Sequence, residues 1–156
     1  MQFLSLSAGL LFLSTVLAQT GKFNTNLTYD QIYDDGDEST QAIACSNGAN
    51  GVIDKEGALT LSEIIGWPNI AGAPAIKHWN SPNCSTCWEL TYNDAILHVF
   101  AIDTATDGFN VGLNVMNNLT NGSAVALGRV AITAVQVLAT ACEQESPRRH
   151  PPPSAP

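Results

Sequence analysis

The chain has 156 residues, with 14 acidic and six basic side chains and a formal net charge of −8 at pH 7. A surface this acidic repels phosphate groups, which argues against nucleic acid and anionic membranes as partners. A neutral ligand such as a sugar is not affected by this charge.

The chain opens with an apolar segment that is typical of a secretory signal. Residues 3–17 form an apolar stretch of the usual length, and the sequence Val16-Leu17-Ala18 has small residues at the two positions that a signal peptidase reads. The stretch lacks flanking charge and is too short to span a bilayer. We therefore expect residues 1–18 to be a signal peptide, cleaved after Ala18, and we expect no membrane span in the rest of the chain.

The next part of the chain predicts short elements joined by turns. Residues 27–38 predict a short strand and an acidic turn, whose carboxylates lack the ligand spacing of a calcium loop. Two glycines and two asparagines in residues 46–51 favour tight turns with positive φ. Residues 60–66 begin with a capping box and predict a short helix. A proline and a glycine in residues 68–72 predict a loop.

The second half of the chain is richer in strand signals. Residues 88–92 alternate between apolar and polar side chains, and residues 95–103 are nearly all apolar, which predicts a central strand buried on both faces. Residues 110–121 fit one helix, with an apolar stripe and a glycine after its end. Residues 128–142 alternate and are rich in β-branched side chains, which predicts one or two strands.

These elements amount to about six strands and two short helices, without a helix–strand repeat. The pattern is mainly β and favours a small closed barrel over a parallel α/β sheet. We expect a single domain at residues 19–142, which is long enough to bury a core. Residues 143–156 hold five of the eight prolines and predict an extended, disordered tail.

The four cysteines are Cys45, Cys84, Cys87 and Cys142. The Cys-x-x-Cys pair suits a redox centre, half of a zinc site or two separate disulfides. A redox pair needs a helix directly after it to lower a thiol pKa, but a strand is predicted there. Zinc needs four closely spaced ligands, and the three histidines are isolated. We therefore expect no metal site and two structural disulfides, which would close loops of about 40–55 residues. Spacing does not choose between the two connectivities that separate the Cys-x-x-Cys pair.

Asp103 is the strongest candidate for chemistry, because it ends a buried strand and precedes a turn, where polar groups often meet ligands. Two carboxylates that flank one bond can hydrolyse a glycoside, and Asp107 lies four residues on. The residues around Asp107 predict a turn that points it to solvent, and Asp103 could simply cap its own turn. Trp67 and Trp79 lie in predicted loops and could stack on sugar rings, whereas Trp88 should be buried.

Four Asn-x-Ser/Thr sequons agree with secretion. Asn26, Asn118 and Asn121 are the candidates for N-glycosylation, and Asn118 and Asn121 are too close for both to be occupied easily. Asn83 is the least suited, because a cysteine follows it.

Several short motifs occur in a fixed order along residues 27–142. They are Tyr29-Asp30, Tyr33-Asp34, the stretches 44–51 and 79–88, Pro68-Asn69-Ile70, Ala101-Ile102-Asp103, Gly108-Phe109-Asn110, Met116-Asn117 and Gly128-Arg129-Val130. Together they closely resemble the cerato-platanin family. The Cys-x-Thr-Cys-Trp and Gly-Phe-Asn pieces are the most specific.

The resemblance implies a secreted fungal protein found in the cell wall, folded as a six-stranded double-ψ β-barrel. It implies the disulfides Cys45–Cys84 and Cys87–Cys142, and a shallow groove for chitin or N-acetylglucosamine oligomers. Carried over by motif, the main groove residues are Asp103 and Asn110. The weaker candidates for the groove are Ser46, Asn47, Gly48, Asn80 and Ser81.

The resemblance also implies activity without hydrolysis and without a cofactor. Family members loosen cellulosic material as expansins do, assemble at interfaces, and act as elicitors or virulence factors on plants, for which a host receptor would be a partner. Asn47 is a departure, since many relatives have Asp at this position. Two alternatives stay open: a weak glycoside hydrolase that uses Asp103 as its acid, and a structural surface protein that works by self-assembly.

Overall fold

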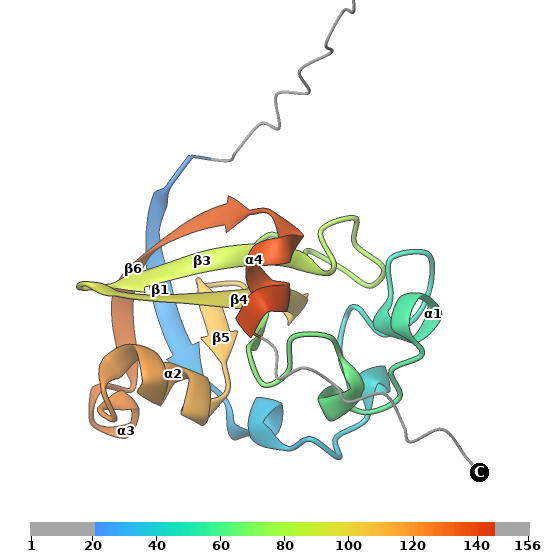
Figure 1. Cartoon of the computed structure of the whole chain (residues 1–156), viewed down its shortest axis with the longest axis horizontal. Coiled ribbons are helices and arrows are strands. Elements are labelled where there is room, and N and C mark those ends of the chain that lie inside the picture. The colour runs from blue at the N-terminus through green and yellow to red at the C-terminus, as the bar shows by residue number, and fades with distance from the viewer. Residues whose placement is uncertain (1–20, 146–156) are drawn as a thin grey trace, which may run out of the picture.

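Six strands close into a barrel in the computed structural model, which describes residues 21–145 (Figure 1). The strands are β1 (Phe23–Tyr29), β2 (Ile70–Ala73), β3 (Thr86–Tyr92), β4 (Ala95–Thr104), β5 (Phe109–Val111) and β6 (Arg129–Val137). Around the barrel they follow the order β1-β5-β2-β4-β3-β6, with parallel pairs β1–β5 and β2–β4. The predicted six-stranded β-barrel is confirmed. The expected signal peptide and residues 146–156 of the expected tail lie outside the described residues.

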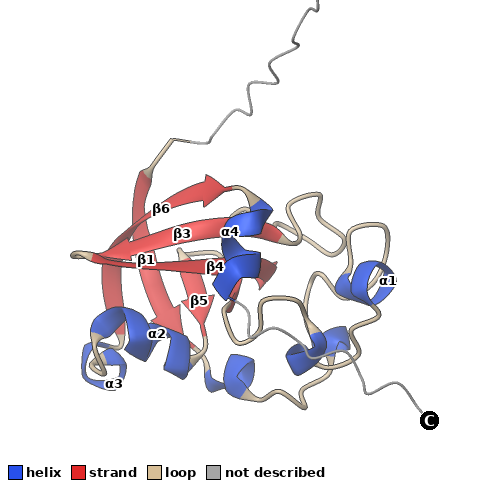
Figure 2. Ribbon diagram, viewed as in Figure 1, coloured by secondary structure: helices blue, strands red, loops and turns tan. Residues whose placement is uncertain are grey.

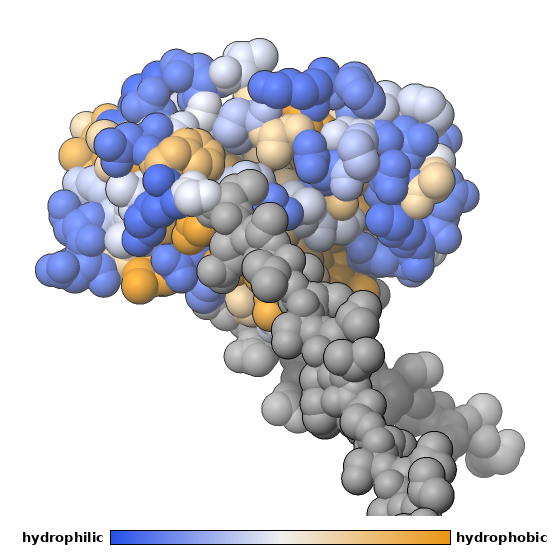
Figure 3. Space-filling view, turned by 90° about the horizontal axis from the view of Figure 1, so that it is seen from above, coloured by the Kyte–Doolittle hydropathy of each residue, from blue (hydrophilic) through white to orange (hydrophobic). Residues whose placement is uncertain are grey.

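Short helices and loops connect the strands. The α-helices of residues 21–145 are α1 (Val52–Glu56), α2 (Leu113–Thr120), α3 (Ala124–Leu127) and α4 (Ala139–Glu145), and the 3-10 helices are η1 (Gln31–Asp34), η2 (Thr40–Ala42) and η3 (Leu61–Glu63). Figure 2 shows α2 and α3 together at one end of the barrel, and α1 among the loops on the other side. The face drawn in Figure 3 is mostly hydrophilic, with apolar side chains in separate small groups. Within the described range, no helix is long and apolar enough to cross a membrane.

Two clusters of buried apolar side chains form the core, and β4 contributes to both. One cluster fills the barrel around Phe109, and the other lies outside β4, against the helices and loops of residues 33–64. Residues 99–102 are all buried and alternate between the two clusters, as the apolar run predicts. The prediction is wrong for the first half of the strand, where Ile96 is 57% exposed. β4 therefore carries one core on each face only near its C-terminal end.

The predicted helix at residues 110–121 is wrong at its start. Asn110 and Val111 belong to strand β5, and the helix begins only at Leu113. The carboxylate of Asp34, on η1, accepts hydrogen bonds from the backbone N–H groups of Leu113 (2.6 Å) and Asn114 (3.2 Å). These are N-terminal N–H groups that the helix itself cannot satisfy. A residue almost 80 positions away thus caps this helix, which local periodicity cannot reveal.

Two further loop predictions are corrected. Residues 68–72 are not all loop, because Ile70–Ala73 form β2 and are all buried. Residues 46–51 do turn at Gly48, whose φ is 89°, but they lead into helix α1, which the sequence did not predict. Both elements are only four or five residues long, so they carry too little periodicity to be recognised.

The one or two strands predicted at residues 128–142 are a single strand, which is followed by a helix. β6 ends at Val137, and Cys142 lies on helix α4, which continues to Glu145 into the segment expected to be tail. The disulfide Cys87–Cys142 holds α4 against β3, and the disulfide Cys45–Cys84 ties the loop before α1 to the loop before β3. This is the pairing that the family resemblance implies. In the chain-entropy view each bridge contributes about 4 kcal/mol.

Candidate functional site

Four residues from four neighbouring strands lie in one row across the barrel. Thr28 on β1 pairs with Asn110 on β5, Asn110 pairs with Gly72 on β2, and Gly72 pairs with Asp103 on β4. Residues that lie directly opposite each other present their side chains on the same face of a sheet. With strands spaced about 4.8 Å apart, this polar row spans roughly 14 Å. The structure therefore brings the two main candidates, Asp103 and Asn110, onto one surface.

A β-bulge turns Asp103 to the outer face of the barrel. Strands β2 and β4 pair in step up to Ala71 and Ala101, and the next pair joins Gly72 to Asp103, so that Ile102 is an extra residue on β4. Strict alternation would turn Asp103 inward, as it does Ala101. The extra residue reverses this, which is how bulges re-aim side chains at functional sites.

The Asp103 carboxylate accepts hydrogen bonds from three other residues. Its Oδ1 accepts hydrogen bonds from the backbone N–H groups of Ala44 (2.9 Å) and Thr104 (2.8 Å). Its Oδ2 accepts a hydrogen bond from the Tyr33 hydroxyl (3.2 Å). Burial, followed by the charge of Asp103, raises the pKa of the Tyr33 phenol well above its ordinary value, so that this hydroxyl remains a donor. Asp103 does cap its own turn, but it also organises the surrounding loops, and its oxygens keep capacity for a further donor.

At Gly72 the polar row has no side chain, so backbone atoms form its surface there. A methyl group on this residue would lie 2.9 Å from the Thr104 carbonyl oxygen and 3.1 Å from the Tyr33 hydroxyl oxygen. Both oxygens therefore reach the row only because glycine leaves room for them.

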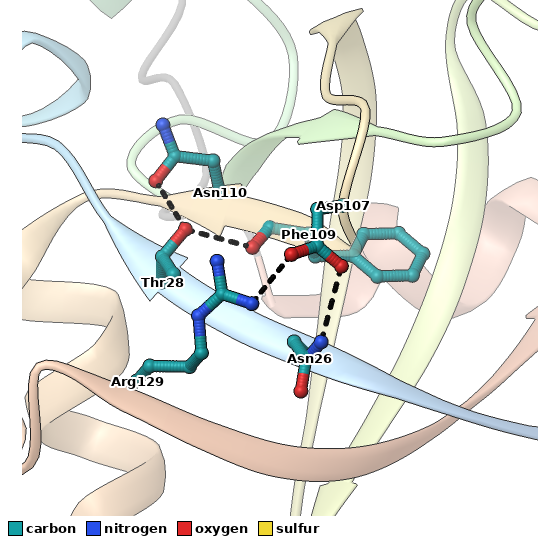
Figure 4. A network of polar contacts seen from close by, with 6 residues as sticks. All are labelled: Asn26, Thr28, Asp107, Phe109, Asn110 and Arg129. Atoms are coloured by element: carbon teal, nitrogen blue, oxygen red, sulfur yellow. Dashed lines mark hydrogen bonds and ion pairs between the residues drawn. The ribbon is translucent and has the colours of Figure 1, made fainter.

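An open hollow of about 330 Å³ adjoins the polar row. It is lined by Thr28, Thr104, Ala105, Thr106, Asp107, Phe109, Asn110 and Arg129. The Thr28 hydroxyl donates to the Asn110 side-chain oxygen (3.0 Å), which fixes the orientation of the amide. In Figure 4 the amide nitrogen of Asn110 points away from Thr28. The hollow thus offers hydroxyl and amide groups at an open surface.

Asp107 and Arg129 form the edge of this hollow. The Arg129 guanidinium donates to the Asp107 carboxylate, which also accepts a hydrogen bond from the Asn26 amide (3.1 Å; Figure 4). These two contacts, with Arg129 first, lower the pKa of the Asp107 carboxyl. Asp107 is exposed, as predicted, but it has partners. Arg129 and Thr28 were not predicted as site residues, because both lie on strands far from Asp103 in the sequence.

Two of the weaker candidates, Gly48 and Asn80, meet in a pair of loops beside Asp103. Asn80 accepts a hydrogen bond from the Asn50 backbone N–H (2.8 Å), and Gly48 packs so closely on Asn80 that a methyl group would lie 2.7 Å from its Cγ. The Asn80 N–H donates to the Ala44 carbonyl (3.1 Å), and the Ala44 N–H donates to Asp103. These loops are therefore coupled to the polar row through one residue.

Asn47 and Trp79 present the exposed groups of these loops. The Trp79 indole N–H donates to the Asn47 side-chain oxygen (2.7 Å), while 56% of the Trp79 surface area is exposed. Ser46 and Ser81 are buried, and the Ser81 hydroxyl accepts from the backbone N–H of Asn83 (3.2 Å). The two serines support the loops rather than face solvent.

The other two tryptophans do not offer an open ring face of this kind. Trp88 is buried, as predicted, with its ring centroid 5.4 Å from that of Phe109. Trp67 is half-buried and donates its indole N–H to the Tyr33 carbonyl (3.3 Å).

The three candidate glycosylation sites differ in their surroundings. Asn118 and Asn121 are exposed at the end of α2, and Asn121 has the left-handed φ of 51° that ends this helix. Asn26 is half-buried on β1, and its amide donates to Asp107. Glycosylation of Asn26 would compete with this contact, so Asn118 and Asn121 remain the better-placed candidates.

The geometry does not favour acid catalysis by Asp107. A glycosidase acid needs a raised pKa, whereas the partners of Asp107 lower the pKa of its carboxyl. Within residues 21–145, no group of three or more His, Cys, Asp or Glu side chains is placed to hold a metal ion. The arrangement is suited to hydrogen bonding of an uncharged ligand.

A comparison with known proteins identifies the family. The family model named Cerato-platanin matches residues 25–144. The chain belongs to the cerato-platanin family. It is 41% identical over 129 residues to the heat-stable 19 kDa antigen of Coccidioides immitis (strain RS). The matched segment covers 83% of this chain and 85% of that protein. The chain is 42% identical over 130 residues to allergen Asp f 15 of Aspergillus fumigatus. This match covers 79% of this chain and 84% of that protein.

Solved structures agree with the assignment to the cerato-platanin family. Cerato-platanin 3 from M. perniciosa superimposes with a TM-score of 0.72 at 39% identity, over 77% of this chain and 98% of that one. A mutant expansin of Clavibacter michiganensis, in complex with cellohexaose, superimposes with a TM-score of 0.52 at 16% identity, over 76% of this chain and 51% of that one. At this identity the likeness to the expansin is one of fold.

Proposed function

We propose that this member of the cerato-platanin family binds neutral sugar oligomers, chitin or N-acetylglucosamine oligomers among them, along the polar row and the loops beside it. The observation that carries the proposal is the alignment of Thr28, Asn110, Gly72 and Asp103 on one outer face next to an open hollow. The net charge of −8 favours an uncharged ligand over an anionic one.

Each group in the row has a role that its chemistry allows. The Asn110 amide N–H groups donate to ligand oxygens, because Thr28 already occupies the amide oxygen. The Asp103 carboxylate accepts from a ligand hydroxyl while it keeps its backbone donors. The exposed Trp79 ring offers an apolar face for a sugar ring. An open groove of this kind is wet and binds weakly.

The proposed activity is binding without hydrolysis. The expansin of similar fold was crystallised with cellohexaose, which supports cellulosic oligomers as a second ligand class. The proposal includes secretion with residues 1–18 removed, residues 19–142 as the binding domain and residues 143–156 as a tail. It also includes loosening of polysaccharide walls and an elicitor or virulence role towards a plant host.

A titration with N-acetylglucosamine tetramer, followed by NMR shifts of the labelled full chain, tests the binding site. Asn110→Ala removes amide donors, so we expect about a fivefold loss of affinity, the worth of one net hydrogen bond. Asn114→Ala is the matched control, because Asn114 is an exposed asparagine on α2 outside the row. Equal affinities of the two variants would refute the site.

A further inference from the structure

A second hollow lies on the outer face of the barrel, and the polar row does not include it. It measures about 220 Å³ and is lined by Asn24, Thr91, Asn93, Ala131, Ile132 and Thr133. These residues come from β1, β3, β6 and the turn after β3.

Both hollows lie along the same pair of strands. On β1 and β6, Thr28 pairs with Arg129 in the first hollow, and Asn24 pairs with Thr133 in the second. Side chains two or four residues apart on a strand share a face, so both hollows open on the outer face of this pair. The four residues from Thr28 to Asn24 correspond to about 13 Å.

The chemistry of the second hollow favours a neutral, hydroxyl-rich ligand. None of its six lining residues has a titratable side chain. Asn24 and Asn93 are exposed, and their side-chain amides can donate to and accept from sugar hydroxyls. Ala131 lies between Arg129 and Thr133 on β6, and its single methyl group leaves the surface between the two hollows open to a ligand.

We propose that the second hollow is a further subsite for a sugar chain whose other units occupy the polar row. The inference rests on the proposed function for the ligand class only. Asn26 lies between Thr28 and Asn24 on β1, and its amide contacts Asp107, which with Arg129 borders the first hollow (Figure 4). These three side chains offer donors and acceptors to sugar hydroxyls on the way to the second hollow. An oligomer long enough to reach both hollows gains from a high effective concentration at the second one.

The test compares N-acetylglucosamine dimer with hexamer in NMR titrations of the labelled full chain. The hexamer should shift the backbone amides of Asn24, Asn93 and Thr133, whereas the dimer bound at the polar row should not. Asn24→Ala removes an exposed amide from the second hollow, so we expect about a fivefold loss of hexamer affinity and no change for the dimer. Asn114→Ala is the matched control, because Asn114 is an exposed asparagine on α2 outside both hollows.

Thermal unfolding separates binding from folding. Asn24 is exposed, so the melting temperature of Asn24→Ala should stay close to that of the parent protein. Hexamer shifts confined to the polar row, or a hexamer affinity unchanged in Asn24→Ala, would overturn the inference. Shifts at Asn93 and Thr133 that survive Asp103→Asn, without any shift at the polar row, would support the subsite while refuting the proposed main site.

Discussion

Asp103 and Asp107 are four residues apart at the same end of the barrel, but their carboxylates have different partners. Asp103 is half-buried and accepts hydrogen bonds from two backbone N–H groups and from the Tyr33 hydroxyl. Asp107 is exposed and binds the side chains of Arg129 and Asn26. A carboxylate bonded to backbone groups fixes loops, whereas an exposed ion pair is screened by water and salt. The same residue type thus organises the site in one position and only borders it in the other.

Gly108, directly after Asp107, should be the most sensitive position at this end of the barrel. A methyl group at Gly108 would lie 2.1 Å from the Asn26 carbonyl oxygen, and the φ of Gly108 is 91°. We expect Gly108→Ala to lower the free energy of unfolding by about 3 kcal/mol, because strain and overlap add. Denaturant unfolding measures this change.

Gly122→Ala is the matched control for Gly108→Ala. Gly122 has a φ of 80°, but nothing lies within 4 Å of the position that a methyl group would take. Only the backbone strain remains, which costs about 1 kcal/mol. Equal losses in the two variants would mean that the turn at Gly108 shifts to relieve the overlap with Asn26, so that this end of the barrel is not rigid.

Removal of each aspartate compares the two carboxylates directly. Asp103→Ala leaves the Ala44 N–H and the Tyr33 hydroxyl without their acceptor, so we expect a loss of about 2 kcal/mol in the free energy of unfolding. Asp107→Ala should change stability far less, because its carboxylate is solvent-exposed. Denaturant unfolding at low and high salt distinguishes them, since only the Asp107 contact should depend on salt. A loss in Asp107→Ala as large as that in Asp103→Ala would contradict the comparison.

The smallest expected effect concerns the hydroxyl of Tyr33. Tyr33→Phe removes one hydrogen bond to Asp103 and should cost about 1 kcal/mol at neutral pH. Burial and Asp103 raise the pKa of the phenol above its ordinary value of 10.0. The unfolded chain therefore loses this proton first as pH rises, so the folded state loses stability above pH 10.

Stability measured by denaturant between neutral pH and about pH 11 checks the role of Tyr33, because this range crosses the ordinary pKa of a phenol. The parent protein should lose stability in this range, and Tyr33→Phe should lose less. Parallel curves for the two proteins would show that the phenol is not coupled to Asp103 as its contacts indicate.

Several features of this protein could be predicted from local sequence. The apolar run of β4, the alternation in β3 and β6, and the position of Asp103 at a strand end all indicated strands of a barrel with a polar group at its rim. Strands β2 and β5 were missed, because four and three residues give too little periodicity. Their burial comes from neighbours on both sides, which no local pattern records.

The candidate site was only partly predictable for the same reason. Asp103 was recognised from its place at the end of a buried strand, whereas Asn110 was recognised only through a family motif. Arg129 was not recognised as a site residue, although it lies in the Gly128-Arg129-Val130 motif. It reaches the hollow because β6 pairs with β1, and it contacts a residue 22 positions earlier in the chain.

By itself, the sequence determined the class of the fold and the pool of polar groups available, because hydrophobic alternation and turn residues act over a few positions. The tertiary structure decided which of those groups meet. The extra residue Ile102 turns Asp103 outward, and the register of β1, β5, β2 and β4 places Thr28, Asn110 and Gly72 beside it. Strand register depends on contacts between segments tens of residues apart, and a shift of one residue would turn each of these side chains to the opposite face.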